Sequence, residues 1–240
     1  MSGSELDDLY AVQERDTTIA QLHHRLDALP ERADLDRTLR AGKIAHDALV
    51  VLRGRHGELS KRIKLLDDET QSIAAKAKVV DEKLYSGKIT SPRELQDLQA
   101  DLDQLRRHQS EVEVRELEEM EVAEQLDAEL RAAEQEVGAR KADVERLQAS
   151  IARQEGEIAA QLDAESKLRA TLTAAVPAVL LTDYERRRDR NNGVGAALLV
   201  GATCQGCRLS IPATEVDDIR RDPAGRRWYC DNCGAILIPR

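Results

Sequence analysis

The segment SGKITSPRE, residues 86–94, separates two long amphipathic stretches of the chain. Gly87 favours an interruption because glycine has a large backbone entropy cost inside a helix. Ser91, Pro92 and Glu94 then match the N-cap, the first and the third positions of a capping box, which predicts the start of a new helix. We therefore expect a turn over residues 85–92.

Upstream of this turn, apolar residues from Leu35 to Leu84 keep one heptad register. Gly42, His56 and Thr70 interrupt it at a positions. The apolar members are Leu35, Leu49, Ile63, Ala77 and Leu84 at a, and Leu52, Leu59, Leu66, Ile73 and Val80 at d. These seven heptads exceed the length that identifies a coiled coil. The register before Pro30 is offset by two residues, which predicts a kink or short break near residue 30.

Downstream of the turn, a second heptad register runs from Leu95 to Leu172. Its apolar members are Leu95, Leu102, Ala123, Leu130, Val137, Val144, Ile151, Ile158 and Leu172 at a, and Leu98, Leu105, Val112, Leu126, Ala133, Leu147 and Leu168 at d. Glu116 and Glu119 fall on the same seam. Leu117 and Met120 lie beside them, which indicates that the apolar stripe drifts by one residue there.

The two stretches have equal lengths, since Ser4–Leu84 and Pro92–Leu172 each contain 81 residues. A helix of that length spans roughly 120 Å, so a short turn can only fold the second helix back antiparallel to the first. Facing residues should then have numbers that sum to about 176, as Leu84 and Pro92 do. The alternative is a parallel homodimer along the whole length, which leaves the interruption at residues 86–92 without an explanation.

Composition and charge agree with long helices. Charged residues form 34% of the chain, aromatic residues 2%, and Phe is absent, which argues against one large globular core. Residues 1–182 hold 26 Lys or Arg against 37 Asp or Glu, whereas residues 183–240 hold ten against eight. The helical part should therefore avoid nonspecific nucleic acid, and the C-terminal part could bind it only through a local patch.

The chain opens without the charged and apolar regions of a signal peptide, and none of its apolar runs approaches the ~20 residues of a membrane span. We therefore expect a soluble, cytoplasmic protein without membrane contact. Its four cysteines form two C-x2-C pairs, Cys204 with Cys207 and Cys230 with Cys233. In a cytoplasmic chain this pattern favours a metal over disulfides.

Two C-x2-C turns can direct four thiolates at one zinc ion. Iron–sulfur and redox-disulfide chemistry are the alternatives, but a redox C-x-x-C usually follows a βαβ pattern that is missing here. Four protein ligands leave no open coordination position, so the site should hold one structural Zn²⁺ and have no catalytic role. Gly206 and Gly234 are expected to give the two turns backbone conformations with φ > 0.

The sequence thus predicts a mainly α fold, a long antiparallel coiled-coil hairpin followed by a small β zinc ribbon. The hairpin should cover residues 1–176, and a second domain should cover residues 177–240. Within the second domain we expect a short helix from Ala178 to Arg190, a strand from Ala196 to Val200, and a β-hairpin. Its strands, Arg226 to Tyr229 and Ala235 to Ile238, should flank the second cysteine pair.

Basic residues interleaved with aromatic ones near the cysteines are candidate contacts to nucleic acid or a protein partner, because this pattern grips single strands. They are Arg186, Arg187, Arg188, Arg190, Arg226, Arg227 and Trp228. The alternative is that the arginines complement a helix dipole, while nearby acidic groups such as Asp183 cancel their field. Trp228 and Tyr229 should point to opposite faces of a strand, one under the zinc turns and one free for a partner.

The whole chain resembles the bacterial C4-type zinc ribbon proteins that carry an N-terminal coiled-coil hairpin. The resemblance rests on Cys204-x-Gly206-Cys207, on Cys230-x-x-Cys233-Gly234, on the run Tyr184–Arg188 and on Ser91–Leu95 after the turn. It implies a zinc-dependent adaptor for nucleic acid or protein, with some members linked to transcription and flagellar gene expression. It does not imply an enzyme.

Two function classes follow from this reading. The first is a non-enzymatic adaptor whose ribbon contacts DNA, RNA or a transcription-related protein. The second is a protein–protein scaffold whose coiled coil docks a partner, with a purely structural zinc. We expect no small-molecule substrate, since neither part offers a reactive pocket, and a monomer or weak dimer.

Overall fold

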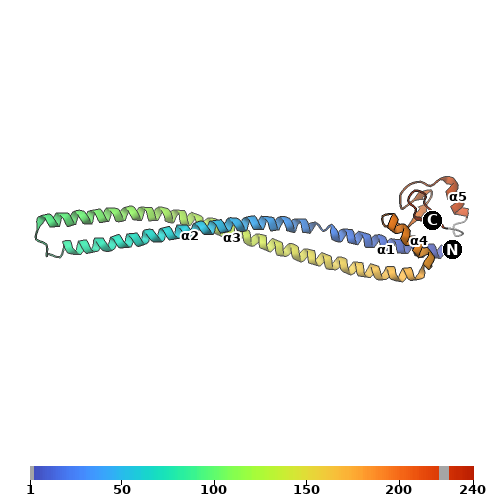
Figure 1. The fold of residues 1–240 in the computed structure, drawn as a ribbon, viewed down its shortest axis with the longest axis horizontal. Helices are drawn as coiled ribbons and strands as arrows, with labels where there is room; N and C mark the ends of the chain where they lie inside the picture. The colour runs from blue at the N-terminus through green and yellow to red at the C-terminus, as the bar shows by residue number, and fades with distance from the viewer. Residues whose placement is uncertain (1–2, 222–226) are drawn as a thin grey trace. The chain divides into compact units, whose positions relative to one another are not determined.

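A computed structural model describes residues 3–221 and 227–240. The helices are α1 (Gly3–Asp27), α2 (Pro30–Leu84), α3 (Pro92–Ala175), α4 (Ala178–Arg190) and α5 (Ala213–Arg221) (Figure 1). The strands are β1 (Ala196–Val200), β2 (Thr203–Cys204), β3 (Trp228–Tyr229) and β4 (Ile236–Pro239). This order confirms the predicted class, a long helical hairpin followed by a small strand-containing region.

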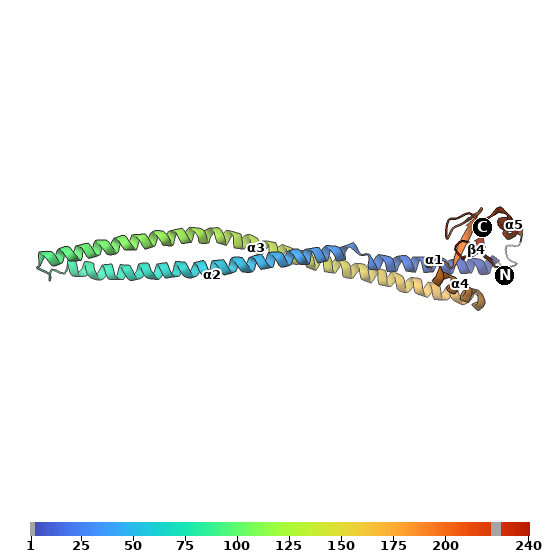
Figure 2. The same cartoon turned by 45° about the horizontal axis from the view of Figure 1, so that its top comes forward.

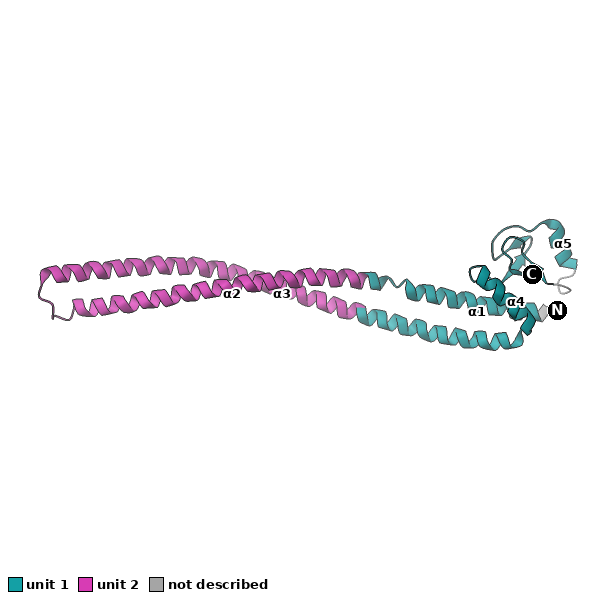
Figure 3. Cartoon of the chain, in the orientation of Figure 1, with its two compact units in different colours: residues 1–33, 148–240 teal, residues 34–147 magenta. Residues whose placement is uncertain are grey.

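Two compact units divide the chain (Figure 3): unit 1 comprises residues 1–33 and 148–240, and unit 2 comprises residues 34–147. In unit 2, α2 and α3 lie side by side and run antiparallel from the turn that joins them (Figures 1 and 2). Each a and d position of α2 from Leu35 to Leu84 is buried or half-buried, including the polar interruptions His56 and Thr70. The predicted register of the first stretch is therefore confirmed.

The predicted drift of the second stretch is wrong. Glu116 and Glu119 stay half-buried in the seam, while Leu117 and Met120 are 60% and 44% exposed. An ion pair explains why the seam tolerates these acidic residues, because Arg62 of α2 donates to Glu119 over 2.9 Å. Leu168, predicted at a d position, is also exposed.

The facing pairs are offset from the predicted register. A Cβ added to Gly42 would meet the Arg140 Cβ at 3.6 Å, and Asp81 pairs with Arg106 over 3.2 Å, so the numbers sum to 182 and 187 rather than 176. The first turns of α3 therefore extend past the end of α2. The prediction failed because it placed the two helix ends directly opposite each other.

The interruptions lie where the sequence indicates. α2 ends at Leu84, Gly87 has a φ of 70°, and the Glu94 amide donates to Ser91 Oγ over 3.5 Å. At the earlier interruption, α1 ends at Asp27 and α2 begins with Pro30, so the chain has a short break there. Proline suits this first helical position because its missing N–H would lack an intrahelical acceptor anyway.

In unit 1, the strands form one sheet in the order β2-β1-β4-β3. The central pair, β1 and β4, is parallel, with Ala196 opposite Ile236, and β3 is antiparallel to β4 as predicted. Successive side chains of each strand point to opposite faces of this sheet, and both faces are covered. One face packs on the cysteine turns and α5 through residues such as Leu199 and Leu237.

The other face of the sheet packs on α1 and α4. Ile236 and Ile238 join Leu9 of α1 and Leu180 of α4 in a second buried cluster. α1 therefore shares a core with the C-terminal sheet. The predicted boundary at residue 176 assigns these core residues to two different domains. α4 itself has the predicted bounds, Ala178–Arg190.

Candidate metal centre

The four cysteines converge on one point of the ribbon, which we define as residues 194–240. Their Sγ atoms all lie within 4.8 Å of one another. Cys204 Sγ is 3.9 Å from Cys233 Sγ, and Cys207 Sγ is 3.7 Å from Cys230 Sγ. Sulfurs placed tetrahedrally around Zn²⁺ at 2.3 Å lie about 3.8 Å apart, so the spacing fits zinc and is too long for disulfides.

The pKa values of the cysteine thiols also fit a site for a doubly charged metal ion. Burial raises the pKa of Cys233 to about 12 and also raises the pKa of Cys204, so these thiols would not ionise alone at neutral pH. The amide of Leu209 lowers the pKa of Cys207. A bound Zn²⁺ deprotonates its thiol ligands outright. The ribbon therefore holds one structural zinc on Cys204, Cys207, Cys230 and Cys233.

Two glycines serve the cysteine turns in different ways. Gly234 has a φ of 73°, as predicted, and its amide donates to the Cys230 carbonyl over 2.7 Å. Gly206 is not among the residues with positive φ, so that part of the prediction is wrong. A Cβ at Gly206 would lie 3.0 Å from the Ala197 Cβ, so glycine is needed there for close packing on β1.

Trp228 lies in the zinc-side core of the ribbon. It is 7% exposed and packs in the same cluster as Cys204, Cys230 and Leu237. Its expected role as a surface contact is therefore corrected, because the alternation of β3 directs it under the cysteine turns. Tyr229 points to the opposite face, as predicted, but it is held by Asp183 and Arg187.

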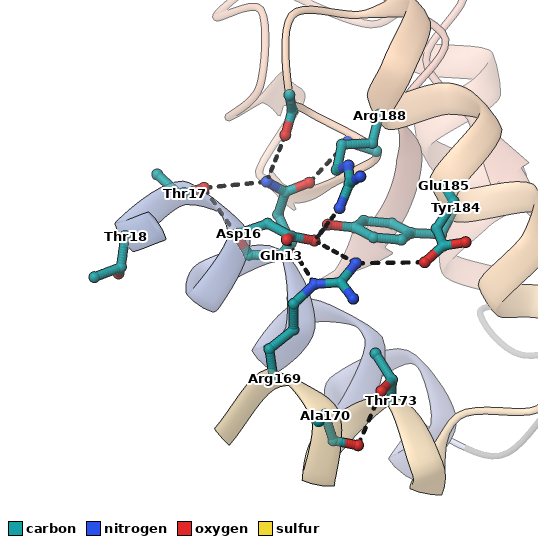
Figure 4. Close-up of polar contacts among 12 residues, drawn as sticks. Gln13, Asp16, Thr17, Thr18, Arg169, Ala170, Thr173, Tyr184, Glu185 and Arg188 are labelled. Atoms are coloured by element: carbon teal, nitrogen blue, oxygen red, sulfur yellow. Dashed lines mark hydrogen bonds and ion pairs between the residues drawn. The ribbon is translucent and has the colours of Figure 1, made fainter. Parts of the chain in front are cut away.

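Gln13 of α1 joins the first helix to the start of the ribbon. The side chain is 5% exposed. Its Oε1 accepts hydrogen bonds from the amides of Gly195, at 2.7 Å, and Ala196, at 3.1 Å. Its Nε2 donates to the Gly193 carbonyl over 3.0 Å (Figure 4). One side chain thus satisfies three backbone groups at the entry to β1.

Asp16 lies one helical turn further along α1, where residues from α3 and α4 converge on it (Figure 4). Arg169 Nε donates to it over 2.7 Å, the Tyr184 hydroxyl over 2.7 Å, and Arg188 pairs with it at 3.0 Å. Burial by itself raises the pKa of the Asp16 carboxyl, but the hydrogen bonds from Arg169, Tyr184 and Arg188 outweigh it and hold the pKa below its ordinary value. Burial also raises the pKa of Tyr184.

Asp183 of α4 is a second carboxylate that gathers several donors. It is buried, 7% exposed, at the junction with the ribbon. It accepts from Arg186 at 2.6 Å and from the Tyr229 hydroxyl at 3.0 Å. Arg187 donates to Asp183 at 3.1 Å and to the Gly234 carbonyl at 2.6 Å, and stacks 3.7 Å above the Tyr229 ring. Although burial raises the pKa of Asp183, the hydrogen bonds from Arg186, Tyr229 and Arg187 lower it overall.

These carboxylates engage most of the predicted contact arginines. Arg186, Arg187 and Arg227 pair with Asp183, and Arg188 pairs with Asp16. Arg190 is exposed, and Arg226 lies outside the described residues. A hollow beside the second cysteine turn is lined by three of the predicted residues, Arg186, Arg187 and Arg190, together with Asn191, Cys233 and Gly234.

None of the helices in the described ranges has a stretch apolar enough to cross a membrane.

Comparisons with known proteins agree with this architecture. Residues 12–192 match the model of the CT398-like coiled coil hairpin domain, and residues 203–237 match the C4-type zinc ribbon domain. The chain is 30% identical over 223 residues to the uncharacterized protein Rv2229c of Mycobacterium tuberculosis, covering 93% of this chain and 90% of the relative.

Solved structures extend the comparison to the fold. A structure from Mycobacterium smegmatis is similar with a TM-score of 0.79 and 25% identity, over 99% of each chain. CT398 from Chlamydia trachomatis has a TM-score of 0.60 at 14% identity, over 99% of this chain and 98% of that one. The HP0958 protein of Helicobacter pylori has a TM-score of 0.52 at 18% identity, over 100% of this chain and 98% of that one. The chain belongs to the family of CT398-like coiled-coil hairpin proteins and ends in a C4-type zinc ribbon.

Proposed function

We propose that this protein is a non-enzymatic scaffold that docks a protein partner on its coiled coil, while one zinc ion stabilises the ribbon. The observation that carries the proposal is that four of the candidate contact arginines, three on α4 and one in the ribbon, pair with carboxylates of unit 1. Arg186, Arg187 and Arg227 surround Asp183, and Arg188 belongs to Asp16. Guanidinium groups that pair with carboxylates inside unit 1 contribute first to its internal structure.

The docking surface that we propose lies on α3 and consists of Val114, Leu117 and Met120. These side chains are 52%, 60% and 44% exposed, because the seam uses Glu116 and Glu119 instead. Residues 111–124 around them include seven glutamates and one arginine. The chemistry fits an amphipathic helix whose apolar face is flanked by Lys and Arg.

Affinity capture from the native cell tests this proposal. The full-length chain should retain a partner that the double variant Val114→Glu with Leu117→Glu loses, because new charges would occupy the apolar contact. Zinc content and helix content should be unchanged. The matched control is Val50→Glu, since Val50 is 54% exposed on α2. Equal capture by the double variant would contradict the docking surface.

A second candidate function is contact with nucleic acid or the transcription apparatus through the ribbon. The hollow lined by Arg186, Arg187 and Arg190 favours it, because three guanidinium groups border one depression. Arg190 is the member best suited to a phosphate, since it is exposed at the end of α4. Because the coiled-coil hairpin carries an excess of acidic residues, any such contact should be confined to this part of the chain.

Salt dependence separates the two candidates. Contact with phosphates gives a steep linear fall of log K with log salt concentration, whereas helix docking gives a shallow one. Arg190→Glu should abolish single-strand binding without loss of zinc, and Arg93→Glu near the turn is the control. Unchanged binding by Arg190→Glu at low and high salt would exclude contact through the hollow.

A further inference from the structure

An exposed apolar stripe runs along α2 in unit 2. Ile44, Val51, Leu65 and Val79 are 72%, 55%, 68% and 51% exposed. They share one heptad position, spaced by seven or fourteen residues, and this position lies outside the a and d seam. The coiled coil itself gives no reason for apolar residues there, because the equivalent outer positions of a solvated helix are usually polar.

The stripe borders a groove between α2 and α3. One part of the groove is lined by Leu65 and Leu66 of α2 and by Val122 of α3, and the adjoining part by Leu59, Val122 and Leu126. The two parts share Arg62 and Val122, so they are continuous. This face of unit 2 is therefore apolar at its centre and charged at its edges.

On the α3 side, the same face offers small residues where α2 has large ones. Gly42 lies opposite Arg140, which sets Ile44 near the level of Ala139 and Val51 near the level of Ala132. Both alanines are exposed, and both occupy the α3 heptad position that corresponds to the stripe. Large side chains of one helix can therefore fit over small side chains of the other.

Charge on this part of the molecule is divided in the same way. Residues 37–64 of α2 hold eight Lys or Arg and two Asp or Glu. Residues 111–136 of α3 hold two Lys or Arg and eleven Asp or Glu. Arg55 and Arg62 border the groove from α2 together with one acidic residue, Glu58. From α3 it is bordered by Glu118, Glu119 and Glu129 together with one basic residue, Arg115, so each side keeps an excess of one sign. One face thus carries both a basic apolar half and an acidic half with small residues.

A surface that contains both complementary halves can bind a second copy of itself through a two-fold axis. We propose that two copies of this chain pair through this face of unit 2, with α2 of one copy over α3 of the other. Ile44 and Val51 then lie over Ala139 and Ala132 of the second copy, and the two basic halves meet the two acidic halves. Residues 34–147 of both copies form a four-helix bundle.

The division of charge selects this arrangement over the other symmetric one. If the stripe packed on itself, two α2 segments with an excess of six positive charges each would face one another, as counted over residues 37–64. Like charges at an interface oppose association. The pairing does not depend on the proposed function, because the partner surface at Val114 and Leu117 does not line the groove.

Sedimentation of the full-length protein over a dilution series tests the pairing. We expect twice the mass of one chain at the higher concentrations, with weaker association as salt is added. Val51→Glu with Leu65→Glu should raise the dissociation constant by about a hundredfold or more, since each tenfold step needs only 1.4 kcal/mol. The matched control, Val114→Glu with Leu117→Glu, should leave the dimer intact. A single-chain mass at every concentration overturns the proposal and leaves a helix of another protein as the occupant.

Cross-linking separates the two arrangements. With zinc saturating the native cysteines, Val51→Cys and Ala132→Cys are prepared as separate proteins and then mixed with a short thiol-reactive cross-linker. We expect a covalent dimer between the two variants. If Ile44→Cys instead cross-links to Val79→Cys in a mixture of those variants, the stripe packs on itself, and the proposed arrangement is wrong.

Discussion

The helices of unit 2 meet along a repeating seam, whereas those of unit 1 meet around a few individual residues. In unit 2 the a and d positions of α2 are buried or half-buried in regular succession, and charged side chains such as Arg53 and Glu134 pair across the outside. In unit 1 the helices contact a sheet, and three polar side chains hold them to each other and to that sheet. Gln13 and Asp183 are buried and Asp16 is half-buried, each with its hydrogen-bond partners.

This difference determines how each unit responds to change. A seam of similar contacts distributes stability over many residues, so that one substitution removes a small share. Unit 1 depends on single groups, because a buried polar atom that loses its partner is left unsatisfied in a low-dielectric environment. Its ribbon further depends on a metal, since a domain of this size buries little apolar surface.

Loss of the metal should produce the largest difference between the units. Cys230→Ser removes one zinc ligand, and structural zinc contributes on the order of 10 kcal/mol to the folding of such modules. We expect zinc loss by elemental analysis and a red shift of the fluorescence of the single tryptophan, Trp228. Helix content by circular dichroism should largely remain. Asn232→Ala, in the same turn, is the control, and one retained zinc per variant chain would contradict the ligand assignment.

A buried amide should be the next most sensitive point. Gln13→Ala leaves the amides of Gly195 and Ala196 without their acceptor, which should destabilise unit 1 by about 2–3 kcal/mol. Thermal unfolding followed by Trp228 fluorescence measures this loss. Gln99→Ala is the matched control in unit 2, because Gln99 is exposed and bonds only the nearby Asp103 among the described residues. Equal effects of the two substitutions would remove the distinction between the units.

Acid should act on unit 1 through Asp16. The pKa of Asp16 is lower in the folded protein than its ordinary value near 3.9, so its contribution to stability is present above that value and is lost as pH falls through the folded pKa. Asp16→Asn should remove this acid-sensitive part and cost on the order of 2 kcal/mol at neutral pH. Denaturant titrations from pH 7 to pH 3 measure both effects. If the free energy of unfolding of Asp16→Asn fell below pH 4 as steeply as that of the unchanged protein, this role would be contradicted.

The smallest expected effect is a stabilisation of unit 2. Within the described residues, Thr70 Oγ1 is buried in the seam without a hydrogen-bond partner. Thr70→Val replaces this hydroxyl by a methyl group of similar size and should stabilise the coiled coil by about 1 kcal/mol. Thr90→Val, in the exposed turn, should change little. A lower unfolding midpoint for Thr70→Val would indicate that the hydroxyl has a partner in solution.

Most of the fold could be predicted from local sequence patterns. Heptad spacing places the seam, and Ser91-Pro92 and Pro30 place helix starts, because these signals act within one or two helical turns. The pairing of β1 with β4 could not be predicted in this way. It joins residues about 40 positions apart, Ala196 and Ile236, through backbone bonds that carry no sequence signature.

The metal centre was predictable because C-x2-C spacing is itself a local geometric requirement. The role of the arginines was not. Arg188 takes its partner from Asp16, which lies 172 positions earlier and occupies an ordinary polar position of α1. Gln13 is equally inconspicuous, since its importance arises only when the segment at residues 193–196, far away in the sequence, meets α1.

The central claim is that one zinc ion stabilises both the ribbon and the helix packed against it. Hydrogen exchange of the full-length protein, with and without a chelator, tests this claim directly. On metal removal we expect amides of β1 and β4 to lose protection together with those of α1 from Leu6 to Gln13, while residues 49–77 of unit 2 keep theirs. Loss of protection in the ribbon alone, with α1 unchanged, would contradict the account.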